Sequence, residues 1–346
     1  MIRLLVVGKD NFKYNRTAVL LSGLIAHPEV DLKVHTLKTK SRKEGSVLSL
    51  LTKDFDYAFV PAFRHTDMGF VKRWSQVPVI FDPLISKFMT KVIDYKHYHK
   101  LFKYIIDYRA FHHADLLIAD TEAHRDYYNR MFNVPLTKSL TLPVGVNTDE
   151  FKPSKLNLEL KSESKAKFVV GFYGSFNPLQ GTSVIMEAAR LLLSNEEIVF
   201  KIIGTGYEYK AAQNQIKSNK LINVELVGWV QQDCLKKEID KFDLCLGIFG
   251  SSLKADSVVP NKIYHYAALG KAILTKDTSG IREIFDESSL ELIKAKSEDL
   301  SQSILKLKDD DRKRKNLGQN ALNVIQGGYT HHHIAQLLVD RMKSGI

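Results

Sequence analysis

The chain has 346 residues, of which 44% are hydrophobic and 26% charged, with a formal net charge of +11. These values are typical of a soluble globular protein with two domains, and no apolar run approaches the roughly 20 residues that span a bilayer. Cys234 and Cys245 have no metal-type spacing, so we expect both to be reduced in a cytoplasmic protein. The positive charge is spread over the chain and is compatible with anionic ligands, nucleic acid or an anionic membrane surface.

The first half alternates short apolar runs with helix-length amphipathic segments. Its first run, "IRLLVVG" at 2–8, is followed by a glycine and has the length of a strand rather than of a signal peptide. Strand and helix in alternation predict a parallel sheet with helices on both faces. The expected strands are 2–8, 31–37, 57–61, 77–82 and 114–120, and helices are expected at 17–26 and 122–132.

The alternation stops and then restarts, which predicts two domains. The polar, lysine- and serine-rich segment around 153–166 has little apolar period and is expected to be a linker between a domain at 1–152 and one at 167–329. A glycine pair before the last helix suggests that this helix turns away from the second domain. The second domain's expected strands are 167–175, 198–206, 223–229, 242–249 and 271–274, and helices are expected at 182–193, 207–218, 231–241, 259–270, 310–324 and 330–343.

Two glycine loops follow strands of the second domain. Gly174 lies in the first loop, and Gly204 and Gly206 lie in the second. Glycines at such turns allow a backbone to approach a phosphate at a helix N-terminus, although each loop alone is better explained as a tight strand-to-helix turn. Neither loop matches G-x-G-x-x-G or a Walker sequence. Together with the helix start described next, they favour an anion site.

The segment "VPNKIYHYAALGKAIL" predicts a helix with a cation at its positive end. Pro260 is expected at the first helical position, Gly270 is the stop signal, and the free amide donors would come from Asn261, Lys262 and Ile263. A lysine in the first turn opposes the helix dipole unless an anion such as a diphosphate binds there. The alternative is a solvated lysine.

Several segments, in order, resemble the family 4 (group 1) retaining glycosyltransferases of GT-B fold. "LPVGVNTDEFKP" at 142–153 resembles the family's crossing between domains. The segments "HHADLLIADTEAHRDYY", "GFYGSF…QGT", "IIGTGYEY", "VELVGWV" and "YHYAALGKAIL" resemble its other motifs in the same order and at similar spacing. The ordered set covers nearly all of the second domain and the end of the first.

This resemblance implies an α/β protein of GT-B architecture, with two Rossmann-like parallel-sheet domains facing each other across a cleft. It implies transfer of a sugar from a nucleotide-sugar donor on the C-terminal domain to a saccharide or lipid-linked acceptor on the N-terminal domain, with retention and with neither metal nor cofactor. The C-terminal helix, about 330–346, would pack back on the first domain. Surface polysaccharide, lipopolysaccharide or glycolipid assembly is the expected setting. A nucleotide-sugar epimerase and a catalytically degenerate binding protein of the same fold are the alternatives.

The chain departs from the family pattern at four charged positions. Ser175 and Gln180 stand where the family has an arginine and a lysine for the diphosphate, and Ser257 and His265 stand where it has paired glutamates. A buried diphosphate still needs positive compensation, for which Lys262, Lys254 and Arg282 are candidates. We therefore assign the diphosphate to Gly174, Ser175, Gly204, Gly206, Asn261, Lys262 and Lys254, the donor sugar and ribose to Asp256, Ser257 and His265, and the vicinity of the base to Trp229 and Val230.

The acceptor side is expected where strands of the first domain end. Lys9, Asp10 and Asn11 follow the first strand and face either the acceptor or only solvent. Asp82 follows the strand at 77–82, where it is a candidate catalytic participant or a helix cap. The histidines at 331–333 have no partner at metal spacing and are interpreted as a helix start.

A basic, aromatic stretch at 86–113 suggests a membrane-facing surface. Lysines there interleave with phenylalanines, tyrosines and isoleucines, as on helices that lie on anionic membranes. A long helix packed on the sheet with a solvated basic face is the alternative. With no recognised nucleic-acid motif, we expect no nucleic-acid partner and a cytoplasmic protein, peripheral on the inner face of the membrane.

Overall fold

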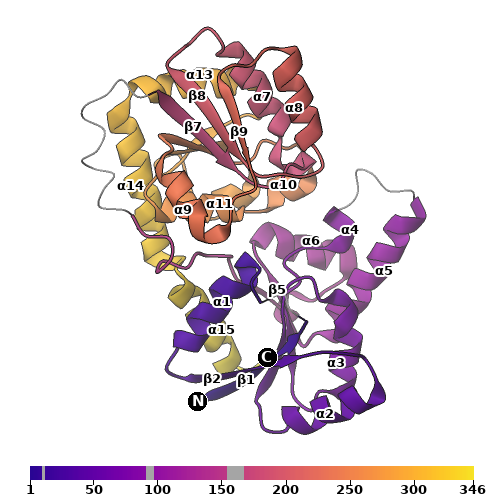
Figure 1. Cartoon of the computed structure of the whole chain (residues 1–346). Helices are drawn as coiled ribbons and strands as arrows, with labels where there is room; N and C mark the ends of the chain where they lie inside the picture. The colour runs from indigo at the N-terminus through magenta and orange to yellow at the C-terminus, as the bar shows by residue number, and fades with distance from the viewer. Residues whose placement is uncertain (10–11, 91–96, 154–166) are drawn as a thin grey trace. The chain divides into compact units, whose positions relative to one another are not determined.

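The computed structural model describes the chain except for residues 10–11, 91–96 and 154–166. It divides into an N-terminal unit, Met1–Asn147 with Gly328–Ile346, and a C-terminal unit, Thr148–Gly327 (Figure 1). Each unit contains a six-stranded sheet whose described strand pairs are all parallel, which confirms the α/β class. Among the described helices, none has the length and apolarity needed to cross a bilayer.

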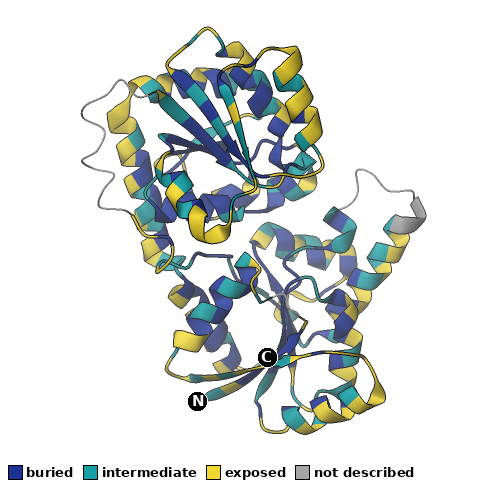
Figure 2. Cartoon of the chain, in the orientation of Figure 1, coloured by how far each residue is buried: buried dark blue, intermediate teal, exposed yellow. Residues whose placement is uncertain are grey.

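The N-terminal unit has the strand order β2-β1-β3-β4-β5-β6. Helices cover both faces of this sheet, and the strands are largely buried between them (Figure 2). Its strands are β1 Ile2–Gly8, β2 Val30–Thr36, β3 Tyr57–Val60, β4 Val79–Phe81, β5 Leu116–Ala119 and β6 Ser139–Thr141. Its helices are α1 Asn15–Ala26, α2 Arg42–Thr52, α3 Met68–Trp74, α4 Lys87–Thr90, α5 His97–His113, α6 Glu122–Phe132 and α15 His331–Lys343.

The last helix, α15, belongs to the N-terminal unit. Thr330 caps it by accepting a hydrogen bond from the His333 amide, so the histidine triplet is a helix start. Gly23 of α1 lets the two helices meet closely, because a Cβ atom there would lie 2.0 Å from the His331 carbonyl oxygen. The apolar face of α15 joins the same core cluster as β1, β4 and β5.

The C-terminal unit has the strand order β12-β11-β10-β7-β8-β9. Its strands are β7 Phe168–Tyr173, β8 Ile198–Ile203, β9 Val224–Gly228, β10 Leu244–Leu246, β11 Ile273–Lys276 and β12 Glu291–Ile293. Its helices are α7 Thr182–Leu191, α8 Tyr209–Ser218, α9 Gln232–Asp240, α10 Leu253–Ser257, α11 Asn261–Ala268, α12 Ser279–Arg282, α13 Ser297–Asp309 and α14 Asp311–Gly328, the last residue of which is counted with the N-terminal unit.

Several elements of the structure are absent from the sequence-based expectation. Strands β6 (SLT) and β12 (ELI) include polar residues, whereas the equally short β4 (VIF) and β10 (LCL) are apolar throughout. Helices α10 and α12 have five and four residues, too few to show a helical period. Helix α13 is long enough but was not predicted. In α11, Pro260 is the N-cap rather than the first helical residue, while Gly270 adopts the left-handed conformation (φ 65°) expected of a stop.

Candidate functional site

The candidate donor site lies at the carboxyl ends of β7 and β10. The chain starts the second sheet at β7, adds β8 and β9 on one side, and then returns to place β10, β11 and β12 on the other. The strand order therefore reverses between β7 and β10. Open α/β sheets bind ligands in the crevice that such a reversal leaves outside the strand ends. The first glycine loop follows β7, and helices α10 and α11 follow β10.

The glycines of the two predicted loops bring the loops against one another. A Cβ atom at Gly204 would lie 2.0 Å from the Gly174 carbonyl oxygen, and one at Gly206 would lie 2.7 Å from the Phe176 nitrogen. The amides of Gly174 and Phe176 donate to carbonyl oxygens at the end of β8 and just beyond it, at 3.0 and 2.9 Å. Loop packing thus explains these glycines, and the Gly174 amide is engaged within the protein rather than open to a phosphate.

Lys262 does not project into solvent as a helix-end lysine would. Its side chain is buried, with 3% of the residue exposed, and its ammonium nitrogen donates a 2.5 Å hydrogen bond to Gln180 Oε1. The same nitrogen lies 3.5 Å from the centre of the Phe172 ring, at the end of β7. A Cβ atom at Gly174 would be 2.9 Å from it. The cation therefore sits under the first glycine loop, at the strand reversal.

The charge of Lys262 is left without an acidic partner. No carboxylate lies within 4.0 Å of its nitrogen in the part of the chain that the structure describes, and burial lowers the pKa of Lys262 well below its ordinary value. An amide oxygen and an aromatic face compensate an ammonium only in part. An anion bound beside it would supply the missing charge and favour the protonated form.

Lys262 and Asn261 are the first two helical residues of α11, where amide groups lack partners within the helix. The third expected donor is not available, because the Ile263 amide donates to the Pro260 carbonyl oxygen at 2.9 Å. Asn261 is half-buried, and Ser175 is exposed in the loop opposite Gly174. Among the residues assigned to the diphosphate, those at the start of α11 and Ser175 of the first loop therefore keep polar groups without a described backbone partner in the helix or are exposed.

His265, which stands at a glutamate position of the family pattern, is enclosed by aromatic rings. It stacks on Phe151, with ring centres 3.8 Å apart, and its Nδ1 shares a 2.6 Å hydrogen bond with the Tyr173 hydroxyl. Burial lowers the pKa of His265 to about 3, so the imidazole is neutral near pH 7. It offers a neutral hydrogen-bonding edge where a carboxylate was expected.

The residues assigned to the donor sugar lie on and around α10. Ser257 is buried, and its hydroxyl donates to the Leu253 carbonyl oxygen at 2.8 Å. Asp256 is paired with Lys276 at 2.6 Å, so this carboxylate already has a cation. Lys254 is half-buried one turn away. Helix α10 lies at the site because it follows β10, the strand next to β7 in the sheet. The Ser257 hydroxyl and the Asp256 carboxylate, however, already have partners within the protein.

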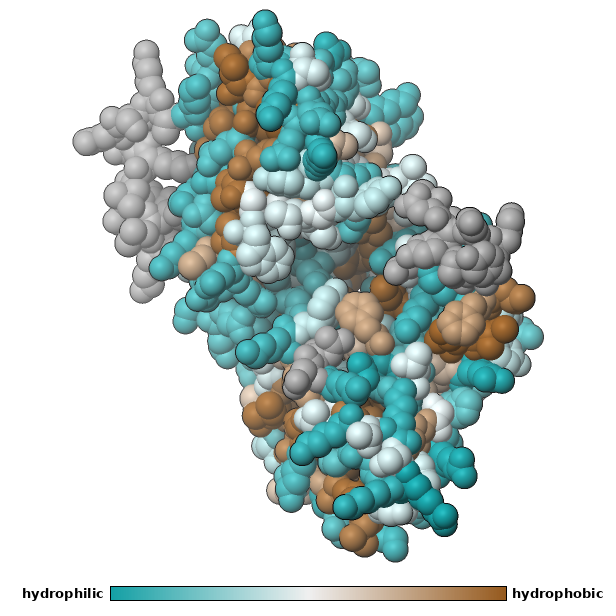
Figure 3. Space-filling view, turned by 45° about the vertical axis from the view of Figure 1, so that its right-hand side comes forward, coloured by the Kyte–Doolittle hydropathy of each residue, from teal (hydrophilic) through white to brown (hydrophobic). Residues whose placement is uncertain are grey.

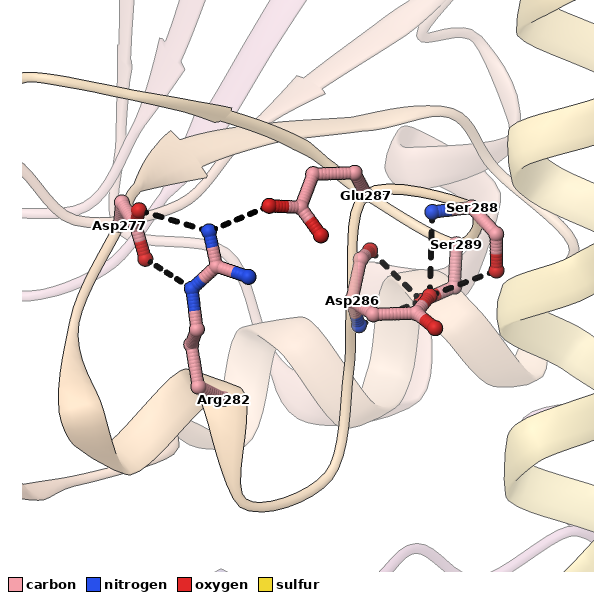
Figure 4. Close-up of polar contacts among 6 residues, drawn as sticks. All are labelled: Asp277, Arg282, Asp286, Glu287, Ser288 and Ser289. Carbon is pink, nitrogen blue, oxygen red and sulfur yellow. Dashed lines mark hydrogen bonds and ion pairs between the residues drawn. The ribbon is translucent and has the colours of Figure 1, made fainter.

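Arg282 does not serve as a free cation for the diphosphate. Its guanidinium group donates to both carboxylate oxygens of Asp277, at 2.7 and 2.8 Å, and to Glu287 at 2.5 Å (Figure 4). Two carboxylates therefore already neutralise this side chain, and they raise its pKa. To compensate the donor, as the sequence suggested, Arg282 would have to exchange these carboxylate partners for the diphosphate.

Trp229 and Val230, predicted near the base, follow β9. Trp229 is 77% exposed and Val230 is half-buried. A large aromatic side chain so exposed at a strand's carboxyl end is available to a planar ligand. Within the described residues, no hydrogen bond or ring contact joins the Trp229 side chain to Lys262.

In the N-terminal unit, the strand order reverses between β1 and β3. Lys9 directly follows β1 there and is exposed, whereas Asp10 and Asn11 lie outside the described residues. Tyr14 and Phe63 form an edge-to-face pair with ring centres 4.8 Å apart, beside the same strand ends. Sequence reasoning missed this pair, although Phe63 lies only three residues after the end of β3.

Asp82, the candidate catalytic residue, is engaged in a buried ion pair. Its Oδ2 accepts from Arg16 Nε at 2.6 Å, and its Oδ1 accepts from the Leu84 amide at 3.0 Å. The two side chains are 3% and 0% exposed. Asp82 also caps no helix, because its backbone partner lies in the turn before α4. This geometry engages Asp82 within the N-terminal unit, and its catalytic role stays a prediction.

Residues 157–324 match the family model of the glycosyl transferases group 1. An uncharacterized glycosyltransferase of Methanocaldococcus jannaschii is 28% identical over 160 residues, which are 43% of this chain and 40% of that protein. The chain thus aligns with less than half of this curated relative. The matched family segment contains the loop after β7, helix α11 and the residues around Lys262.

Solved glycosyltransferase structures share the fold over almost the whole chain. Anabaena HepE with UDP and glucose has a TM-score of 0.77 at 12% identity, covering 99% of this chain and 100% of its own. Sucrose-phosphate synthase of Thermosynechococcus elongatus has a TM-score of 0.75 at 11% identity, covering 99% of both chains. The lipopolysaccharide outer core galactosyltransferase WaaB gives 0.66 at 12% identity, with 100% coverage of both. The GT-B fold class predicted from the sequence is confirmed.

Proposed function

We propose that this protein is a nucleotide-sugar-dependent glycosyltransferase whose C-terminal unit binds the donor and whose N-terminal unit binds a saccharide or lipid-linked acceptor. The family match of the C-terminal unit and the GT-B fold support this assignment. HepE was crystallised with UDP-glucose, which makes UDP the first nucleotide to test. WaaB acts on the lipopolysaccharide outer core, which favours surface polysaccharide or glycolipid assembly as the setting.

The single observation that carries the proposal is the buried, uncompensated ammonium of Lys262. Isolated buried charges are costly, and an amide oxygen with an aromatic face compensates this one only in part. A nucleotide diphosphate at the start of α11 would pair with it in a site of low dielectric constant. When the glycosidic bond to the donor breaks, negative charge grows on the leaving diphosphate, and Lys262 would stabilise that charge.

The stereochemistry and the role of metals belong to this proposal as well. Retention follows from the resemblance to the retaining family rather than from the geometry of the site. In the proposed mechanism the Lys262 ammonium supplies positive charge to the leaving group, as a metal ion does in other transferases. His265 would contact the ribose through the part of its ring edge away from Nδ1, because Phe151 stacks on one face and the Tyr173 hydroxyl already bonds Nδ1.

A peripheral membrane location is the remaining part of the proposal. Helix α5 exposes Leu101 (62%), Phe102 (64%), Ile105 (41%) and Tyr108 (42%) on neighbouring turns. Apolar surface is visible on the side of the N-terminal unit where α5 lies (Figure 3). Lys100 adjoins these residues, and apolar side chains flanked by cations suit an anionic membrane surface. Residues 91–96 of the predicted stretch lie outside the described residues.

A thermal-shift panel with UDP, GDP and ADP tests the donor assignment. A ligand that binds only the folded protein raises its melting temperature, so the wild type should respond to one nucleotide. Lys262→Met should lose that response, whereas Lys210→Met, which removes an exposed lysine on α8, should keep it. A full response in Lys262→Met would refute the role of this lysine. No response to any nucleotide in the wild type would favour a degenerate binding protein, and product formed without acceptor would indicate an epimerase.

A further inference from the structure

We propose that the N-terminal unit binds an anionic saccharide chain in a groove that crosses helix α3 at Gly69. The groove consists of two hollows that share this glycine. One is lined by Lys40, Arg42, Gly69, Phe70, Arg73 and Trp74, between α2 and α3. The other is lined by His65, Thr66, Gly69, Ile106, Arg109, Ala110 and His113, between α3 and α5. That the ligand is the acceptor rests on the proposed function.

The size of the hollows suits sugar residues. Their volumes are about 660 and 570 Å³, within the range of roughly 300–1,000 Å³ that small-molecule sites occupy. Both are open rather than enclosed, and they lie on opposite sides of one short helix. A chain of several sugar units, rather than a single compact ligand, would fill both at once.

Gly69 of α3 separates the two hollows and lines both, and we call this point of the helix the saddle. The fold does not require a glycine there. Gly69 is exposed in the first turn of α3, and its φ angle is not positive. A Cβ atom would meet only His113 Nε2, at 3.8 Å, among atoms outside its own helix and chain neighbours. Glycine is among the least favourable residues in helices, so its presence here needs another reason. A ligand that passes directly over the helix backbone provides one.

Arginines without acidic partners surround the saddle. Arg42, Arg73 and Arg109 are exposed, and within the described ranges no carboxylate lies within 4.0 Å of any of the three guanidinium groups. Lys40 is neutralised by Asp67, at 2.7 Å. That acid is itself buried and shared with Arg64, so it presents little charge to the groove. Three uncompensated guanidinium groups favour a ligand that carries carboxylate, sulfate or phosphate groups.

Aromatic side chains provide the apolar part of the first hollow. Trp74 is half-buried and fixed beneath α2, where Gly45 leaves room for it: a Cβ atom at Gly45 would lie 2.2 Å from the indole ring. Phe70 lies one turn earlier and is half-buried as well. Rigid aromatic faces pack against the apolar C–H faces of sugar rings while the arginines bind the anionic substituents.

The groove differs from the apolar face of α5 that is proposed to bind the membrane. The exposed apolar side chains of α5, from Leu101 to Tyr108, lie on a face of the helix next to that of Ile106, Ala110 and His113. The groove itself exposes cations and half-buried rings but no large apolar patch. A saccharide chain fits this combination better than a bilayer does, and binding by vesicles or by nucleic acid becomes an outcome of the test.

Direct binding of a sulfated heparin-type pentasaccharide tests the proposal, with neutral maltopentaose as the matched control ligand. We expect the wild type to bind the sulfated chain at least about tenfold more tightly than the neutral one. Arg73→Gln and Arg109→Gln should each weaken binding about fivefold. Lys72→Gln, which removes a cation of α3 that is paired with Asp115, should leave binding unchanged.

Gly69→Leu is the decisive variant, because it blocks the saddle without removing charge. It should weaken pentasaccharide binding about tenfold or more, with an unchanged or higher melting temperature, and Gly69→Ala should show the same direction with a smaller effect. Full binding by Gly69→Leu, equal binding of maltopentaose, or equal competition by single-stranded DNA or anionic vesicles would overturn the proposal. The nucleotide thermal shift should be unaffected in all these variants, so a failure here is distinguishable from a failure of the donor assignment.

Discussion

The Lys262 ammonium lies 2.5 Å from the Gln180 amide oxygen, and this hydrogen bond joins the start of helix α11 to the loop after β7. In the family pattern the position of Gln180 is a lysine. Two ammonium groups at this distance would repel strongly. Gln180 therefore makes room for Lys262 beneath the first glycine loop, so the chain carries one buried cation where the pattern has cations on the loop itself.

Gln180→Glu should therefore weaken nucleotide binding while leaving the protein folded. The new carboxylate would pair with Lys262, supply the missing negative charge and repel an incoming diphosphate. We expect nucleotide affinity to fall about tenfold, which corresponds to roughly 1.4 kcal/mol, as measured by titration calorimetry. Gln180→Met is the matched control: it removes the hydrogen bond without adding charge and should reduce affinity less. Equal losses in the two variants would show that the charge of the site is not what matters.

The neutral state of His265 should make the C-terminal unit sensitive to acid. Burial lowers its pKa to about 3 in the folded chain, against about 6.5 when unfolded. Between these values the unfolded state binds more protons, so stability rises with pH and falls as the solution is acidified. His265→Gln should remove about one proton from this dependence, which is roughly 1.4 kcal/mol per pH unit between about pH 4 and pH 6.

Urea denaturation at several pH values measures that slope for the wild type and the variant. His65 of the N-terminal unit has a pKa lowered to about 3 as well, so the difference between the two proteins is the relevant quantity. His112→Gln removes an exposed histidine and should leave the slope unchanged. Parallel curves for His265→Gln and the wild type would contradict a buried, neutral imidazole at this position.

The Arg16–Asp82 pair should act on stability rather than on chemistry. Asp82→Asn leaves the buried Arg16 guanidinium without its counter-charge, and such a loss costs on the order of 3 kcal/mol or more. We expect a lower urea midpoint, with nucleotide binding by the C-terminal unit unaffected. A variant that keeps its stability but loses turnover would return Asp82 to the catalytic role that the sequence suggested.

The sequence was sufficient for the fold because the buried strands of both sheets are continuous apolar runs. The segment "IRLLVVG" coincides with β1, and the strand expected at 198–206 begins with β8 but extends three residues beyond its end. Lys262 was also singled out correctly as unusual, since a cation at a helix N-terminus contradicts the dipole. Its environment was not predictable, because the Gln180 and Phe172 contacts join residues about 80 to 90 positions apart.

For Asp82 and Arg282, the sequence did not predict the ion-pair partners of the side chains. Both are charged residues near strand ends, which is the pattern of a site. Their partners, Arg16 for one and Asp277 with Glu287 for the other, decide whether the charge is available. Asp277 and Glu287 are each five positions from Arg282, yet a spacing of five predicts no contact by itself, and Arg16 is 66 positions from Asp82. Charge compensation is a property of the folded chain, so residue type and position alone could not predict that both side chains are already ion-paired.

The exposed apolar residues of α5 give the membrane proposal a direct test. The double variant Leu101→Ser/Phe102→Ser removes two side chains that are each more than half exposed, and so should not disturb the core. Inserting such side chains into a bilayer contributes about 1.5–3 kcal/mol each, so co-sedimentation with anionic vesicles should fall at least about tenfold. Ile222→Ser, which removes an apolar side chain that is 89% exposed in the C-terminal unit, should sediment like the wild type.

The charge of Lys100 is tested separately. Lys100→Gln should reduce vesicle binding most at low salt, since attraction to the membrane surface is screened within about a Debye length. Sedimentation that is absent in the wild type, or identical in the double variant, would show that this face of α5 serves another purpose.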